Sequence, residues 1–371
     1  MKNKLNTSLK TACEIGLREG VCSGISAAVS VVSNNVKYRC FFGYGATRSD
    51  HFGGEITPAT LFDLASLTKP LCTTLCTLAL IDAGQFTWRD SCLSQLDPDI
   101  SSEKNGISIQ DILRHVSGLP AYQPYFHQFE PCTGRENIPH LLQHILAEPL
   151  THPPGSISLY SDLGFILLGR LIELNTRQTL DRFFYHTIAK PLHLDSYLRF
   201  LPIGTVGQYE KEAMPATEYC PWRHKLLQGE VHDEHCWLMG GVAGHAGLFG
   251  TAEGVLLLCE HLLDCWQEKK RHPAFSNDLL RYAIEWNDDS GHWALGFDRP
   301  TPGQSSSGRY FSPSSVGHLG FTGTSFWIDP DRQLIVVLLT NRVHPSRENM
   351  KIREFRPFFH DYLLEKIAMM A

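Results

Sequence analysis

The sequence predicts an α/β fold in which strands from both ends of the chain join one sheet, with an inserted, mostly helical region between them. Runs typical of strands occur near residues 24–44 and again near 293–339, and helical spacing fills most of the chain between. No internal repeat or low-complexity tract interrupts the pattern. We therefore expect a discontinuous α/β domain of residues 1–87 and 248–371. Residues 88–247 would form the inserted helical region and the other wall of a cleft.

The first quarter of the chain predicts a helix, a hairpin and a second helix. Residues 6–19 have helical spacing that ends at Gly20. Two strands, 24–33 and 36–44, flank Asn34 and Asn35, a pair that favours a tight hairpin turn. A polar loop then leads to a strongly apolar helix over 67–83, which ends before Gly84.

Short helices and late strands make up the rest of the prediction. Helices at 109–116, 138–147, 162–175 and 180–190 alternate with loops rich in Pro, Gly and His, and helices at 254–266 and 275–285 follow. Strands are expected at 293–297, 321–328 and 333–339, the last two joined by a turn at Pro330 and Asp331. A final helix covers 357–369, with Pro357 tolerated in its first turn.

Composition excludes several classes of protein. With 371 residues, of which 43% are hydrophobic, the chain can bury a large core. A net charge of −6 without a basic run argues against binding to nucleic acid or anionic membranes. No apolar stretch reaches the roughly 18 residues of a membrane span.

Cellular location is predicted from the N-terminus and the cysteines. Residues 1–20 lack the apolar core of a secretory signal. The eleven cysteines are odd in number and show no C-x-x-C pair, which indicates free thiols in a reducing compartment. We expect a cytoplasmic protein, or a periplasmic one if a leader was trimmed from the N-terminus.

The strongest chemical motif is Ser66-Leu67-Thr68-Lys69 at the start of the apolar helix. A serine and a lysine three residues apart share one helix face, and the helix N-terminus offers free N–H groups. A lysine that is partly desolvated and near other cations can lose its proton and activate the serine. The simpler alternative is an N-cap serine with a solvated lysine, but the apolar helix beyond favours the wall of an active site.

Two further motifs follow in the chain. Tyr160-Ser161-Asp162 precedes an apolar helix, and a lysine nearby would lower the pKa of the tyrosine and make it a proton shuttle. Alternatively, the tyrosine only packs under a helix whose N-cap is Asp162. Residues 318–324, His-Leu-Gly-Phe-Thr-Gly-Thr, lead into a strand, and their glycines allow close approach of the backbone to a substrate. A backbone N–H there, with that of Ser66, could polarise a carbonyl.

Together, and in this order, the three motifs resemble those of the serine β-lactamase-like family, in its branch of class C β-lactamases, D-alanyl-D-alanine carboxypeptidases and esterases. The segments 107–120, 191–194 and 240–249 also resemble stretches of that family, and the resemblance spans roughly residues 20 to 365. It implies an antiparallel sheet flanked by helices, and a hydrolase without cofactor or metal that takes a small-molecule or peptide substrate.

The resemblance also implies a role for each matching residue. Ser66 corresponds to the acylated nucleophile, and Lys69 and Tyr160 to the proton-transfer pair. The N–H groups of Ser66 and Phe321 correspond to the oxyanion hole. The substrate-binding positions are Asp162, His318, Leu319 and Gly320.

Three of these positions depart from the family pattern. His318 replaces a lysine that helps to bind a carboxylate, Leu319 removes a hydroxyl, and Asp162 replaces a neutral amide. The changes argue against efficient hydrolysis of β-lactams and favour small esters, amides or peptides of the D-amino-acid or cell-wall type. Another cation from a loop, such as Arg223 or Lys225, could take over the role of the missing lysine.

Other functions remain open at this point. Residues 228–236 are rich in possible metal ligands, and His232 and His235, with His224 and His245 nearby, would allow a metal hydrolase, although no H-E-x-x-H motif occurs. A protein that binds wall fragments or β-lactams without turnover, or an acyltransferase, could use the same scaffold. The sequence does not predict an oligomeric state.

Overall fold

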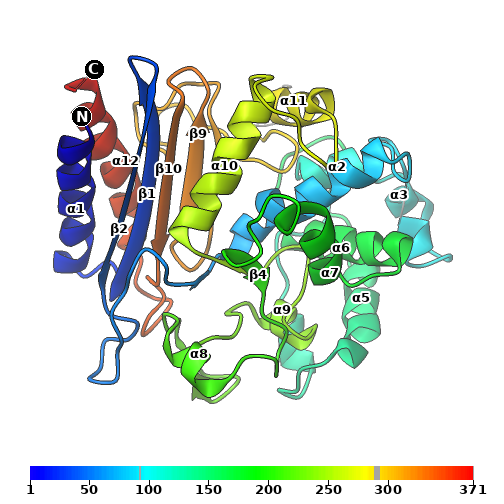
Figure 1. The fold of residues 1–371 in the computed structure, drawn as a ribbon. Helices are drawn as coiled ribbons and strands as arrows, with labels where there is room; N and C mark the ends of the chain where they lie inside the picture. The colour runs from blue at the N-terminus through cyan, green and yellow to red at the C-terminus, as the bar shows by residue number, and fades with distance from the viewer. Residues whose placement is uncertain (92, 288–292, 371) are drawn as a thin grey trace.

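The computed structural model describes residues 1–91, 93–287 and 293–370, and its centre is a five-stranded antiparallel sheet (Figure 1). The strand order is β2-β1-β10-β9-β8. The strands are β1 (Gly24–Ser33), β2 (Val36–Gly45), β8 (Val316–Leu319), β9 (Ser325–Asp329) and β10 (Leu334–Thr340). Strands from both ends of the chain therefore share one sheet, as the sequence predicts.

Helices cover both faces of this sheet. The two terminal helices, α1 (Lys2–Arg18) and α12 (Ile352–Ala368), lie on one face, and α10 (Ala252–Trp266) lies on the other (Figure 1). Along β10, Leu334, Val336 and Leu338 belong to the core under the terminal helices. The alternate residues Ile335 and Val337 belong to the core shared with α10. Because both faces are buried, this strand is apolar at every position rather than alternating.

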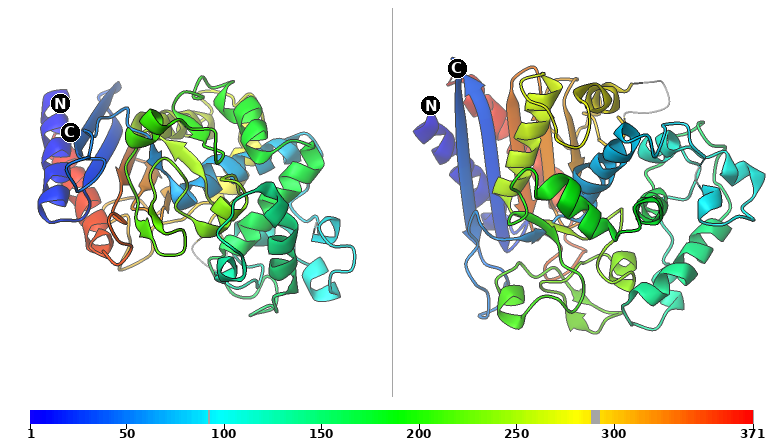
Figure 2. Two further views of the ribbon diagram at one scale, coloured as in Figure 1. Left: turned by 90° about the horizontal axis from the view of Figure 1, so that it is seen from below. Right: turned by 45° about the vertical axis from the view of Figure 1, so that its right-hand side comes forward.

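Most of the remaining helices gather beyond α10, away from α1 and α12 (Figure 2), whereas α8 (Gln208–Glu212) lies below the large sheet in the view of Figure 1. The others are α2 (Leu75–Asp82), α3 (Ser102–Asn105), α4 (Ile109–Leu113), α5 (Ile138–Ala147), α6 (Asp162–Thr176), α7 (Leu180–Phe184), α9 (Glu234–Leu238) and α11 (Asn277–Glu285). Two small sheets accompany them, one of β3 (Phe62–Asp63), β7 (Leu248–Gly250) and β4 (Leu198–Phe200), the other of β5 (Tyr219–Cys220) and β6 (Lys225–Leu226). The division into residues 1–87 with 248–371, and 88–247, stays a prediction.

The first hairpin is confirmed, and its turn has the expected chemistry. Asn34 and Asn35 both adopt left-handed backbone conformations, with φ of 50° and 62°, which asparagine tolerates better than most residues. The preceding helix starts at Lys2, four residues earlier than its spacing predicts.

The strand predicted at 293–297 is wrong. Gly296 turns the chain with a φ of +81°, and Asp298 makes only an isolated bridge to Gly317. The edge strand is β8, which contains His318 and Leu319. The next strand begins at Ser325 rather than at 321, because residues 320–324 form the turn between β8 and β9.

Two helices also differ from prediction, both around a proline. The segment predicted as one helix over 67–83 consists of a 3₁₀ turn (Ala65–Leu67), a π-helical turn (Lys69–Thr74) and α2. Pro70 has no N–H to donate to a preceding turn, which disfavours regular α-helical bonding there. The last helix starts at Ile352, so Pro357 lies inside it and not in its first turn.

Ten of the cysteines lie in the described part of the chain, and all ten carry free thiols, nine of them buried. Cys92 lies outside the described residues. Among the described residues, no helix combines the length and apolar character needed to cross a membrane.

Gly244, in the segment that resembles the family, has a packing role that can be tested. A Cβ there would lie 2.1 Å from the carbonyl oxygen of Phe165 and 2.9 Å from the Cα of Gly169. We expect Gly244→Ala to reduce the free energy of unfolding by about 1–3 kcal/mol in urea titrations. Gly207→Ala is the matched control, because its Cβ would meet nothing within 4 Å. Equal stability of the two variants would contradict this assignment.

Candidate active site

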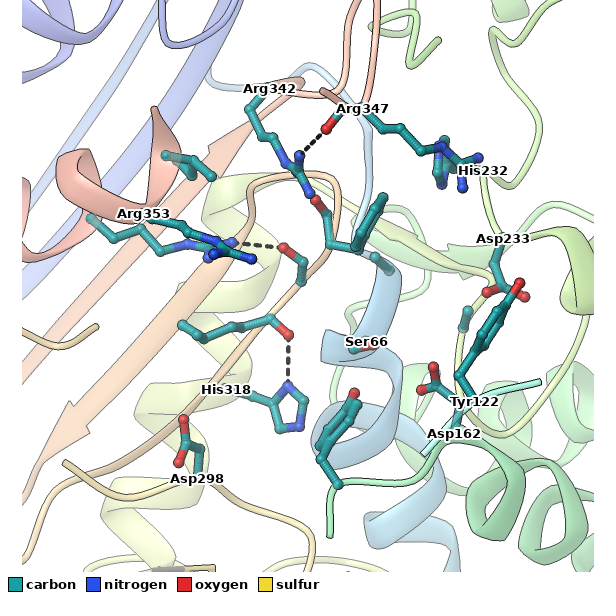
Figure 3. A pocket seen from close by; sticks show the side chains of 18 of the residues that line it. Ser66, Tyr122, Asp162, His232, Asp233, Asp298, His318, Arg342, Arg347 and Arg353 are labelled. Carbon is teal, nitrogen blue, oxygen red and sulfur yellow. Dashed lines mark hydrogen bonds between the residues drawn. The ribbon is translucent and has the colours of Figure 1, made fainter. Parts of the chain in front are cut away.

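A cavity of about 580 Å³ opens between the β8–β9 turn and the helical region, and it brings the predicted site residues together. Ser66 lies at its centre, with His318 on one side and Asp162 on the other (Figure 3). Tyr160, Leu319, Gly320 and Phe321 also line it. Lys69, fully buried, lies behind Ser66.

Ser66 is presented by a strained turn. The preceding residue, Ala65, has a φ of +49°, a conformation that costs energy for a residue with a Cβ. The Asp63 carboxylate accepts hydrogen bonds from the N–H of Ala65, at 2.8 Å, and from the N–H of His232, at 2.7 Å. These bonds fix the turn, so the hydroxyl of Ser66 projects toward the cavity.

The ammonium of Lys69 has three acceptors for its three hydrogens. Its Nζ donates to Ser66 Oγ at 3.0 Å, to Asp162 Oδ1 at 2.5 Å and to the carbonyl oxygen of His245 at 3.1 Å. Burial alone would lower the pKa of Lys69, but the charge of Asp162 and the Tyr160 phenol outweigh it and raise the pKa. The expectation of a lysine that readily loses its proton is therefore wrong, because Asp162 holds it charged.

Tyr160 stands beside this pair within an aromatic cluster. Its ring lies 4.9 Å from Lys69 Nζ, 4.6 Å from the ring of His115 and 5.5 Å from that of Trp293, and its phenol interacts with Lys69 and Ser66. Burial raises the pKa of Tyr160 to about 12 despite the neighbouring lysine, so the predicted lowering is wrong. The phenol is therefore a neutral proton donor at neutral pH.

The helix after Tyr160 is capped by Ser161 and not by Asp162. Ser161 Oγ accepts a hydrogen bond from the N–H of Gly164, at 3.4 Å, and the Ser161 N–H donates to His115 Nδ1 at 3.1 Å. This capping leaves the Asp162 carboxylate free to contact Lys69.

The β8–β9 turn is tied to the segment that carries Ser66. Thr322 Oγ1 donates to the carbonyl oxygen of Asp63 at 2.8 Å, and Thr324 Oγ1 donates to that of Leu64 at 3.0 Å. A Cβ on Gly320 would lie 1.9 Å from Thr324 Oγ1, so only glycine fits there. Among the described residues the Phe321 N–H has no acceptor. It borders the same cavity as Ser66, a placement compatible with the predicted oxyanion hole.

His318 is a buried neutral base in this cavity. Its side chain is almost fully buried, and its Nδ1 lies 2.8 Å from the carbonyl oxygen of Leu319, so Nδ1 carries the proton. Burial and the charge of Lys69 lower the pKa of His318 to about 3. The Nε2 atom is buried without a partner among the described residues, which leaves its lone pair available as an acceptor.

The expected substitute cations, Arg223 and Lys225, do not line the cavity. Arg223 donates to the carbonyl oxygens of Val231 and His232, and Lys225 pairs with Glu230. The arginines that line the cavity come instead from the segment after β10 and from α12: Arg342, Arg347, Arg353 and Arg356. Of these, Arg342 and Arg347 lie above Ser66 in Figure 3.

These four arginines differ in their partners. Arg347 binds the carboxylates of Glu218 and Glu234. Arg356 donates to backbone carbonyl oxygens, whereas Arg342 donates to backbone carbonyl oxygens and to Met350 Sδ and lies over the Phe321 ring; burial lowers the pKa of both. Arg353 is exposed and forms no ion pair with any described residue. Sequence reasoning missed this group, because no motif marks it.

Carboxylates line the opposite side of the cavity. Asp162, Asp233 and Tyr122 lie together there (Figure 3). Asp233 Oδ1 lies 2.7 Å from His245 Nε2 and accepts the N–H of Cys236 at 2.8 Å. Burial and the nearby charges of Asp233 and Glu234 raise the pKa of Tyr122, so its phenol is neutral. The sequence marks Asp233 only as a possible metal ligand within residues 228–236, and no motif marks Tyr122.

The histidines proposed as metal ligands have different neighbours. His232 Nε2 lies 3.3 Å from Glu218, whereas the ring of His235 packs against Tyr122 and Tyr125. Within the described ranges, the group that could hold an ion is Glu218, Cys220 and Glu234. Arg347 already places its cationic group against both of those carboxylates.

The chain matches known proteins over most of its length. The model of the family described as Beta-lactamase matches residues 14–356. A protein of Salmonella agona (strain SL483) named "Putative D-alanyl-D-alanine carboxypeptidase" is 31% identical over 328 residues, which cover 80% of this chain and 72% of that protein. A protein of the same name from Salmonella typhi is also 31% identical, with the same coverage.

Solved structures with a similar fold include enzymes of several activities. EstCE1, described as a hydrolase with promiscuous acyltransferase activity, superimposes with a TM-score of 0.73 at 18% identity, covering 96% of this chain and 99% of that one. A class C β-lactamase gives a TM-score of 0.73 at 17% identity, covering 98% and 96%. Family model, relatives and fold agree with the resemblance seen in the motifs, and the chain belongs to the β-lactamase family of serine hydrolases.

Proposed function

We propose that this protein is a serine hydrolase that forms an acyl-enzyme at Ser66 and acts on small esters, amides or peptides of the D-amino-acid or cell-wall type. The single observation that carries the proposal is the contact of 3.0 Å between Lys69 Nζ and Ser66 Oγ inside a cavity large enough for such substrates. The names of the Salmonella relatives favour the same chemistry.

In the proposed reaction, Ser66 Oγ attacks the substrate carbonyl carbon, and its proton passes to Lys69. Because Lys69 is already an ammonium, it must give a proton up at the same time, and Asp162 Oδ1 at 2.5 Å is the nearest acceptor. The N–H groups of Ser66 and Phe321 stabilise the negative charge that develops on the carbonyl oxygen.

The leaving group takes its proton from Tyr160, whose phenol is neutral, and Tyr160 regains a proton from Lys69. The Lys69–Asp162 pair then returns to its starting state. Water attacks the acyl-enzyme by the reverse proton route and releases the acid.

The nucleophile can be tested by labelling. We expect a fluorophosphonate probe to add to Ser66 of the native protein, identified by peptide mass spectrometry, and Ser66→Ala to abolish hydrolysis of p-nitrophenyl acetate. An adduct on another serine, or none on folded protein, would remove the assignment and favour a binding protein without turnover.

Loss of either proton-transfer residue should slow acylation far more than it affects folding. We expect Lys69→Ala and Tyr160→Phe each to reduce the acylation rate by a factor on the order of 10²–10⁴ in stopped-flow measurements. Circular dichroism should match the wild type for the comparison to count. A Tyr160→Phe variant with a near wild-type rate would instead assign protonation of the leaving group to Lys69.

Weak activity on β-lactams is also expected. Where the family pattern has a lysine and a hydroxyl that bind the substrate carboxylate, this chain has neutral His318 and Leu319. With a pKa of about 3, His318 stays neutral in mild acid, so the ratio of nitrocefin to p-nitrophenyl butyrate turnover should stay constant from about pH 7.5 to pH 5. His318→Lys should raise this ratio about ten- to a hundredfold, the effect of one charge-assisted contact. A wild-type ratio that rises in mild acid would show that His318 titrates and would contradict this explanation.

A further inference from the structure

Around Asp162, Asp233 and His318 the walls of the cavity offer hydrogen-bond acceptors, whereas its arginines lie on another wall. The contacts of the Asp233 carboxylate with His245 and Cys236 both go to Oδ1, and the contact of the Asp162 carboxylate with Lys69 also goes to Oδ1. Each carboxylate therefore keeps its Oδ2 without a partner among the described residues. Both side chains are partly exposed, at 23% and 21%, and both line the cavity.

A second, independent acceptor lies on the opposite side of Ser66. His318 Nε2 is buried, borders the cavity and has no partner within the described part of the chain. Its lone pair is left without a hydrogen bond, a state that costs free energy until a donor arrives. A ligand that brings N–H or O–H groups would satisfy it, whereas a carboxylate would not.

The two sides serve different parts of the substrate. The leaving group must lie near Tyr160, its proposed proton donor, and the Tyr160 ring is 6.0 Å from that of His318. The acyl group then extends to the other side of Ser66, toward Tyr122, Asp162 and Asp233 (Figure 3). One positive charge there would complement two carboxylates, of which Asp162 pairs with Lys69 and Asp233 lies against His245.

We propose that the acyl group of the substrate carries an ammonium group, which binds between Asp162 and Asp233. The substrates would be amides, esters or peptides of an amino acid with a free amino group, and the N–H of an amide leaving group would reach His318 Nε2. This inference rests on the proposed acyl-enzyme at Ser66 and names its substrate class.

The test compares pairs of substrates that differ only in the charge of the amine. We suggest the p-nitrobenzyl esters of D- and L-alanine and of their N-acetyl forms, with product acid measured by chromatography. At pH 6.5 the free amines are charged, and kcat/KM should be on the order of ten- to a hundredfold higher for the free amine of at least one enantiomer, the effect of one charge-assisted contact. Above about pH 8 the preference should fall as the amine loses its proton.

The ratio of kcat/KM for the free amine to that for its N-acetyl form reports the effect of the amine charge, because both substrates of a pair use the same catalytic groups. The titratable groups around Asp233 act on both substrates of a pair equally; they are Asp63, Tyr122, Asp162, Glu234, His235, Cys236 and His245.

Asp233→Asn should reduce the preference for the free amine toward unity. The asparagine keeps an oxygen for His245 and for the N–H of Cys236, so the loop can retain its hydrogen bonds. Asp278→Asn is the matched control, because it removes one charge from a residue that is 89% exposed and absent from the cavity lining. If the asparagine at 233 prevents folding, the pH dependence of the wild-type ratio still decides the question.

Turnover of p-nitrophenyl acetate separates this inference from the proposed function. If the wild type hydrolyses the acetate but prefers no free amine, hydrolyses none of the alanine esters, or keeps its preference in Asp233→Asn, the ammonium site is wrong while the acyl-enzyme stands. If the acetate is not hydrolysed and Ser66 is not labelled, the proposed function itself fails.

Discussion

A buried lysine ammonium needs three acceptors, and much of the structure around Ser66 supplies them. The acceptors of Lys69 come from three separate places in the chain: the turn of Ser66, the first residue of α6 and the loop that carries His245. An unpaired ammonium at this depth would cost several kcal/mol, so these three segments are held in one arrangement. The close packing of Gly244 against α6, next to the His245 carbonyl, allows that loop to reach Lys69.

The large sheet is tied to the segment that carries Ser66. The β8–β9 turn is bonded through Thr322 and Thr324 to the residues just before Ser66, and Arg356 of α12 donates to the carbonyl oxygens of Gly320 and Thr324. The N–H of Phe321 therefore keeps a fixed place relative to the serine hydroxyl. Such preorganisation is what stabilises developing charge without reorganisation during a reaction.

Local motifs predicted which residues form the site. They could not predict the pKa values of those residues, because these depend on how deeply each side chain is buried. Ser66, Tyr160 and Phe321 border one cavity, as the resemblance implies, while their catalytic roles stay predictions. The pKa directions of Lys69 and Tyr160 were wrong because they depend on Asp162 and on complete burial, which a motif does not encode. No motif marks the arginines of the cavity, and the predicted start at Pro357, five residues after the observed start of α12, left Arg353 and Arg356 outside the predicted helix.

The charges in the cavity are also arranged differently from those the motifs suggest. On β8, neutral His318 offers a lone pair where a lysine would offer donors, and on α6, Asp162 offers a charge where an amide would be neutral. Positive charge lies instead on the arginines of another wall, of which Arg342 and Arg347 lie above Ser66 in Figure 3. A ligand whose charges complement those of the cavity walls would place a positive group next to Asp162 and Asp233 and any negative group next to Arg353. Two of the departures from the family pattern are therefore mutually consistent: His318 removes a positive charge from β8, Asp162 adds a negative charge on α6, and both suit the substrate ammonium proposed above.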